Sequence, residues 1–142
     1  MFDSDAIRKR LSKLDEYARI LRELQAADPA QFITDYHLYG LAERYLQLSI
    51  ECLLDICSTI ILGVGLRKPE RYQEAITILS EAGVLSAGLA HRLAGVAGFR
   101  NILVHEYLDV DRRLVYRYLQ EHLGDLEAFA RDVILFTRSH QP

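Results

Sequence analysis

Apolar residues recur every three or four positions along most of this chain, and the strict alternation that marks a strand is nearly absent. In residues 5–27 the apolar stripe consists of Ile7, Leu11, Leu14, Ala18, Leu21 and Leu24. Asp3 or Ser4 can accept hydrogen bonds from the open amides at the start of this segment. Asp28-Pro29 ends it, because the residue before a proline is disfavoured in the helical region. The pattern predicts an amphipathic helix.

The second segment, residues 30–62, is apolar around most of its circumference when side chains are placed about 100° apart. Such a helix belongs at the centre of a bundle. A narrow polar strip remains, formed by Arg44, Gln47, Glu51, Asp55 and Ser58. Because an unpaired buried charge is costly, these groups must pair, reach water or face a partner. Two interpretations stay open: an internal salt bridge, between Arg44 and Glu51 or with a basic residue on another helix, and a strip that lines a functional cleft.

Three more helices are expected after a break at residues 63–69. They cover residues 69–82, residues 86–104 and a last segment that follows Asp111. Gly83 ends the first of them, and Ser86 and Asp111 can cap the other two. The chain contains no internal repeat. The expected fold is therefore an all-α five-helix bundle in which residues 1–142 form a single domain.

Composition narrows the class of protein. The formal net charge is −3, so nucleic-acid binding would need a local basic patch. No uninterrupted apolar run reaches the roughly 18 residues that cross a bilayer, and the N-terminus is acidic where a secretory signal is basic. Cys52 and Cys57 project about 140° apart on a helix, which argues against a local disulfide and favours reduced core residues. We expect a soluble cytoplasmic protein without a membrane partner.

Most sequence signatures of catalysis are missing. The chain has no phosphate-binding glycine loop, no Cys-x-x-Cys pair, no His-Glu-x-x-His and no Gly-x-Ser-x-Gly. The five histidines are scattered and lack metal-ligand spacing to acidic or cysteine partners; they are His37, His91, His105, His122 and His140. The sequence predicts no metal centre and no cofactor.

One stretch, residues 98–107, embeds polar groups in an apolar run: Arg100, Asn101, His105 and Tyr107. Arginine supplies a permanent cation whose planar fork fits phosphate, and histidine exchanges a proton near neutral pH. These two groups are the minimum for metal-free RNA cleavage. His105 would take the proton of a ribose 2′-hydroxyl or pass one to the leaving oxygen, while Arg100 stabilises charge on the phosphoryl oxygens. A surface arginine beside an ordinary helix-end histidine is the alternative.

The spacing of these residues sets a geometric condition. Positions five apart on a helix diverge by about 140°, so Arg100 and His105 converge only if the helix ends between them or a second copy of the chain completes the site. Asn101 and His105 are four apart and share one face, where the amide could orient the imidazole.

The order Arg-Asn-x3-His-x-Tyr resembles the Arg-x4–6-His signature of HEPN-domain ribonucleases, in the Arg-x4-His-x-Tyr form of the HepT toxins. Residues 43–56 are similar to the central-helix pattern of this family, and residues 69–83 resemble its next segment. The similarity covers about residues 5–135 in the expected order. It implies a HEPN-type bundle.

The resemblance also implies an activity and its partners. HepT-like proteins are homodimers whose two motifs meet in a composite cleft, and they act on RNA as metal-independent endoribonucleases without a cofactor. Arg100 would stabilise the transition state, His105 would act as acid and base, and Asn101 would support the histidine. The antitoxin of such a type VII toxin–antitoxin pair is an MntA-type nucleotidyltransferase. It would transfer AMP from ATP to Tyr107, and the adenylate would fill the cleft and repel RNA. Without the family, Tyr107 is better interpreted as a packed aromatic residue with a solvated hydroxyl.

Two further groups of residues are candidates near the motif. Three arginines could contact RNA: Arg112, Arg113 and Arg117. A solvated face paired with acidic neighbours is the alternative, and these neighbours are Asp109, Asp111 and Glu121. The polar strip of the second segment could orient Arg100 or His105 across the bundle; its members are Arg44, Gln47, Glu51 and Asp55. No basic–aromatic interleaving of the kind that stacks single-stranded bases is evident.

Two other functions stay open. HEPN-like bundles also serve as non-catalytic accessory partners that bind nucleotide or substrate for a nucleotidyltransferase. Arg100 and His105 would then hold a phosphate without cleaving anything. A dimeric helical scaffold is the third hypothesis, under which neither polar side chain matters for function.

Overall fold

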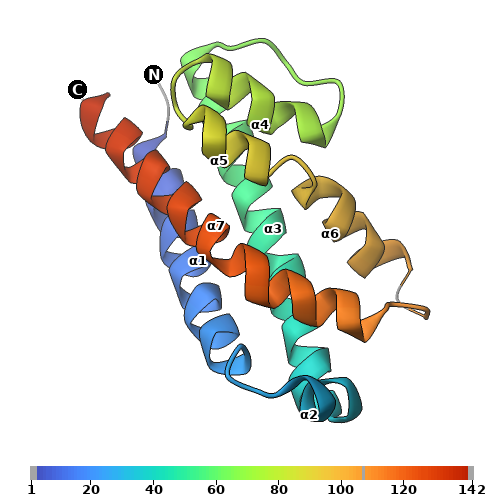
Figure 1. Cartoon of the computed structure of the whole chain (residues 1–142). Coiled ribbons are helices and arrows are strands. Elements are labelled where there is room, and N and C mark those ends of the chain that lie inside the picture. Colours follow the sequence, from blue (N-terminus) through green and yellow to red (C-terminus); the bar gives the residue numbers. More distant parts are fainter. Residues whose placement is uncertain (1–2, 107, 141–142) are drawn as a thin grey trace.

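The computed structural model describes residues 3–106 and 108–140, which form seven helices and no strand. In chain order they are α1 (Ser4–Leu24), α2 (Pro29–Thr34), α3 (Tyr36–Val64), α4 (Tyr72–Glu81), α5 (Ala87–Arg92), α6 (Val96–His105) and α7 (Arg112–Ser139). Helix α3 runs through the centre of the bundle, where α1, α6 and α7 pack against it (Figure 1). Helices α4 and α5 gather near the C-terminal end of α3 (Figure 1). The expected all-α fold is confirmed.

Local chemistry sets the two ends of the central helix. At its start, Asp35 Oδ1 accepts a hydrogen bond of 2.9 Å from the amide of His37. At its end, Gly65 takes a left-handed conformation with φ of +79°, where a Cβ atom would be strained. The amides of Gly65 and Leu66 then both donate to the carbonyl of Ile61, at 3.1 and 3.0 Å. These caps fix the length of α3 and the direction of the loop that follows.

Two of the five expected helices are divided in the structure. The segment expected over residues 30–62 becomes α2 and α3, because Asp35 is extended and uses its side chain to cap the next helix. The segment expected over residues 86–104 becomes α5 and α6, separated by residues 93–95. The second break gives the motif a helix of its own.

The core is built around α3. Its largest fully buried side chains are Leu46, Ile50, Leu53, Ile56 and Ile60. Cys52 and Cys57 are buried and free, which confirms that they are reduced core residues. Burial raises the pKa of the Cys52 thiol to about 11 and also raises that of Cys57. The Cys52 thiol donates to the carbonyl of Arg10 at 3.1 Å and so links α3 to α1.

Helix α3 is also long and apolar enough to cross a membrane. An 18-residue stretch of this helix has a mean hydropathy of 1.6 and contains at most two charged residues. Half of that stretch is buried inside the bundle. The core helix of a soluble protein passes the same test, so the finding is weak evidence for a membrane span.

Candidate active site

Helix α6 carries Arg100, Asn101 and His105. Its buried side chains, Val96, Ala97, Phe99 and Leu103, pack it against α3 and α4. The helix continues through His105, and the amide of Glu106 still donates to the carbonyl of Ile102 at 3.0 Å. The helix therefore does not end between Arg100 and His105, which leaves a second copy of the chain as the way to bring them together.

The guanidinium of Arg100 is held by side chains from two helices. Its Nη2 donates to Glu51 Oε1 on α3 at 3.3 Å, and its Nη1 donates to Asn101 Oδ1 at 3.2 Å. Gln47 Nε2 donates to the same Glu51 oxygen at 3.2 Å. The Arg100 side chain is 27% exposed, and its Nε atom is buried without a hydrogen-bond partner among the described residues. A fixed, half-buried guanidinium with open N–H groups is suited to bind an anion.

Only part of the polar strip of α3 reaches the motif. Gln47 and Glu51 contact each other, and Glu51 contacts Arg100. Arg44 and Asp55 are exposed, and their side chains form no hydrogen bond or ion pair with the rest of the described chain. The salt bridge expected for Glu51 therefore forms with a basic residue on another helix, and this residue belongs to the motif itself.

His105 is exposed at the end of α6. Among residues 3–106 and 108–140, its ring makes no hydrogen bond or ion pair. Asn101 shares a face with His105, but its side-chain oxygen accepts from Arg100 instead. The structure thus leaves the His105 imidazole available to a substrate or a second subunit. Tyr107 lies outside the described residues.

The three arginines after the motif have different environments. The Arg112 guanidinium lies 3.8 Å from the centre of the Tyr39 ring and donates to the carbonyl of Ile33 at 2.9 Å, so it holds α7 against α2 and α3. Arg113 and Arg117 are exposed and line a hollow of about 540 Å³. In the described part of the chain, no ion pair joins these arginines to the acidic neighbours expected from the sequence, Asp109, Asp111 and Glu121.

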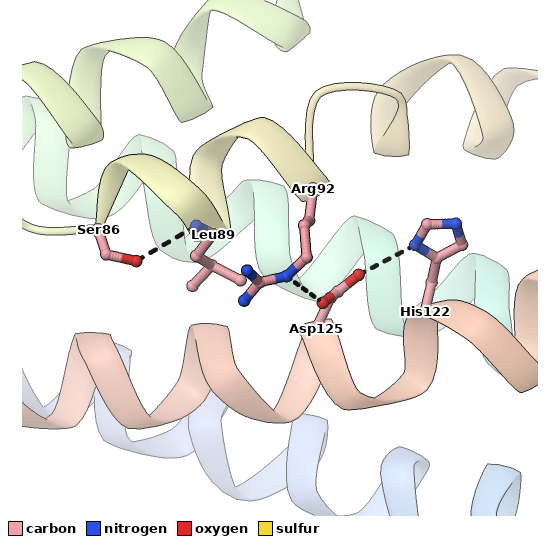
Figure 2. Close-up of polar contacts among 5 residues, drawn as sticks. All are labelled: Ser86, Leu89, Arg92, His122 and Asp125. Carbon is pink, nitrogen blue, oxygen red and sulfur yellow. Dashed lines mark hydrogen bonds and ion pairs between the residues drawn. The ribbon is translucent and has the colours of Figure 1, made fainter.

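A polar cluster that the sequence did not point to lies between α5 and α7. Asp125 is 8% exposed, and its Oδ1 accepts from Arg92 Nε at 2.7 Å. Its other oxygen lies 3.0 Å from His122 Nδ1, one turn earlier on α7 (Figure 2). Tyr118 lies beside His122, with ring centres 4.5 Å apart, and stacks on Phe99 of α6 at 3.9 Å. This chain of contacts joins α5 and α7 to the residue that precedes Arg100.

Replacement of Asp125 by alanine should destabilise the fold by about 1–3 kcal/mol, because it removes the buried carboxylate that holds Arg92 of α5 and His122 of α7. Urea unfolding of the purified variant measures this change. The matched control is Asp55→Ala on an exposed position of α3, which should change the free energy of unfolding by less than about 0.5 kcal/mol. Equal stabilities of the two variants would contradict a structural role for the cluster.

Comparison with known proteins decides the family. The model of the family described as ribonuclease HepT-like matches residues 14–133. The chain belongs to the HepT-like family. The resemblance expected from the motif is thereby confirmed, and so is the ribonuclease class at the level of the family.

Relatives with described activities support the same assignment. The mRNA nuclease HepT of Shewanella oneidensis is 29% identical over 126 residues, which cover 87% of this chain and 94% of the relative. The tRNA nuclease HepT of Aphanizomenon flos-aquae is 27% identical over 127 residues, which cover 89% of this chain and 86% of the relative. Both matches include most of each chain.

A solved structure shows how one HepT-like protein is modified and bound. The tri-AMPylated HEPN toxin of Shewanella oneidensis, in complex with its MNT antitoxin, matches with a TM-score of 0.84 at 25% identity. The match covers 94% of this chain and 99% of that one. The HEPN-type bundle expected from the sequence is confirmed by this similarity.

Among the described residues, no group of three or more histidine, cysteine, aspartate or glutamate side chains is placed to hold a metal ion.

Proposed function

We propose that this protein is the toxin of a HepT/MntA-like toxin–antitoxin pair and cleaves RNA as a metal-independent endoribonuclease. The observation that carries the proposal is that one helix bears both a fixed Arg100 guanidinium and an exposed His105 imidazole, whose ring has no partner among the described residues. Membership of the HepT-like family and the named activities of its relatives support it.

The chemistry assigns one role to each group. His105 takes the proton from a ribose 2′-hydroxyl, or passes a proton to the leaving 5′-oxygen. Arg100 stabilises the negative charge that grows on the phosphoryl oxygens. Glu51 and Asn101 position the guanidinium, since both accept hydrogen bonds from it. Tyr107 is the residue that accepts AMP.

A homodimer completes the site in this proposal. Arg100 and His105 lie five positions apart on the same uninterrupted helix, so their side chains diverge by about 140°. One phosphate can meet both groups if the guanidinium comes from one protomer and the imidazole from its partner. A two-fold axis near α6 would form two such sites in each dimer.

Expression of the protein alone should arrest bacterial growth, and co-expression of its MntA-type nucleotidyltransferase should restore it. Intact-mass spectrometry of the co-expressed protein should show added mass in multiples of an adenylate. A Tyr107→Phe variant should gain no adenylate, because it lacks the accepting hydroxyl, and the arrest should persist. Tyr116→Phe, which removes another tyrosine hydroxyl, is the matched control and should remain modified.

Two results would contradict this proposal. Unimpeded growth with the protein alone would favour a non-catalytic accessory partner of the nucleotidyltransferase. Full neutralisation of an unmodified Tyr107→Phe variant would instead favour inhibition by simple obstruction of the cleft.

A further inference from the structure

A groove with basic side chains runs between α1 and α3. It has a volume of about 380 Å³ and is lined by Lys9, Arg10, Lys13, Tyr17, Leu48, Glu51, Cys52 and Asp55. The charged groups in this lining are three cations, all from α1, and two carboxylates, both from α3. The cations of the lining outnumber its carboxylates by one and all lie on the α1 side, in a protein whose formal net charge is −3.

The basic side chains of the groove are available for binding. Lys9 is exposed and forms no ion pair with the rest of the described chain. Lys13 pairs with Glu16 at 3.1 Å, but both side chains are more than half exposed, so this pair is weak and can exchange for a phosphate. Arg10 donates to the carbonyl of Ala6 at 3.3 Å, and its other guanidinium N–H groups have no acceptor among residues 3–106 and 108–140.

An aromatic side chain shares the face of α1 that carries these cations. Lys9, Lys13 and Tyr17 are four residues apart in succession, which places them on one side of the helix. The Tyr17 ring is partly exposed and leans against Tyr45, with 5.7 Å between ring centres. Cations that follow the backbone and an aromatic ring for base stacking are the two components of grooves that bind single-stranded nucleic acid. The groove therefore offers both components, with the aromatic ring at one end of the row of cations.

The groove adjoins the motif through a shared side chain. Glu51 lines the groove, and its Oε1 lies 3.3 Å from Arg100 Nη2. Cys52, on the floor of the same groove, holds α1 against α3 by its hydrogen bond to Arg10. The Glu51 carboxylate, neutralised by Arg100, therefore marks the place where the groove and the motif meet on α3.

We propose that this groove binds the backbone of the single-stranded RNA substrate beside the phosphate held by Arg100, with one base stacked on Tyr17. The inference rests on the proposed function and adds to it the class of substrate and the surface that holds it. Lys9, Arg10 and Lys13 contact phosphates on one side of the cleaved bond.

The test measures binding of a fluorescent 2′-O-methyl oligouridylate, a single strand that cannot be cleaved by attack of its own 2′-hydroxyl. The double variant Lys9→Glu/Lys13→Glu should bind at least tenfold more weakly than the unmutated protein. The slope of log Kd against log salt concentration should decrease by about 1.4, because two phosphate contacts are lost and each contributes about 0.7 to this slope with single strands. The matched control is Lys68→Glu/Arg71→Glu, which changes the net charge equally at a different hollow, and it should bind within about twofold.

Substitutions of Tyr17 separate stacking from charge. Tyr17→Phe keeps the ring and should retain affinity, whereas Tyr17→Ala should bind the same oligonucleotide about tenfold more weakly. Circular dichroism of both variants checks that α1 remains folded.

Equal binding by the charge-reversal variant and its control would overturn the groove proposal. The groove proposal would also be overturned if the Lys9→Glu/Lys13→Glu variant bound RNA normally but no longer bound the nucleotidyltransferase, because the surface would then serve a protein partner. Cleavage of a natural RNA by the unmutated protein is measured in parallel. If the unmutated protein does not cleave RNA, the proposed function is refuted. If it does cleave RNA but the groove variants bind RNA as tightly as the unmutated protein, the groove proposal alone is refuted.

Discussion

His105→Ala should lower the rate of RNA cleavage by about 10²- to 10⁴-fold, the range typical of a lost general acid or base. The structure leaves this imidazole exposed and unengaged by described residues, so its removal disturbs no packing. Arg100→Ala should lower the rate by about 10²- to 10³-fold through loss of charge stabilisation in the transition state. The measurement is cleavage of a labelled RNA by purified protein in the presence of EDTA.

The control for this experiment is His91→Ala. His91 is an exposed histidine on α5, away from the motif helix, and its loss should leave the cleavage rate unchanged. Equal activity of the unmutated protein, His105→Ala and Arg100→Ala would rule out the catalytic assignment. Loss of activity in EDTA for the unmutated protein would contradict metal-independent cleavage.

The pattern of apolar residues was sufficient to predict the long helices. The stripe from Ile7 to Leu24 corresponds to α1, and Asp111 caps α7 as expected, with its carboxylate accepting from the amide of Arg113 at 2.9 Å. The helical breaks were harder to predict because a short interruption hardly disturbs the apolar period. Asp35 nevertheless carried a local signal, since an aspartate that caps a following helix must itself leave the helical conformation.

Contacts between helices were less predictable than the helices themselves. The strip containing Gln47 and Glu51 was recognisable, but its partner depended on the register at which α6 packs on α3. The pairing of Arg92 with Asp125 spans 33 residues and has no local signal apart from an acidic residue within an apolar stripe. In contrast, the spacing of Lys9, Lys13 and Tyr17 was visible in the sequence, but only the structure shows that these residues line a groove together with α3.

In the proposed site, two side chains from different protomers act on one phosphate. Arg100→Ala and His105→Ala chains, carrying different affinity tags, can be co-expressed and their heterodimer purified through both tags. Each parent homodimer lacks a complete site, whereas a heterodimer retains one intact pair out of two.

We therefore predict that the purified heterodimer cleaves RNA at about half the rate of the unmutated dimer, while both parent homodimers remain at least about 100-fold slower than that dimer. A heterodimer as inactive as its parents, or chains that do not copurify, would contradict a shared site.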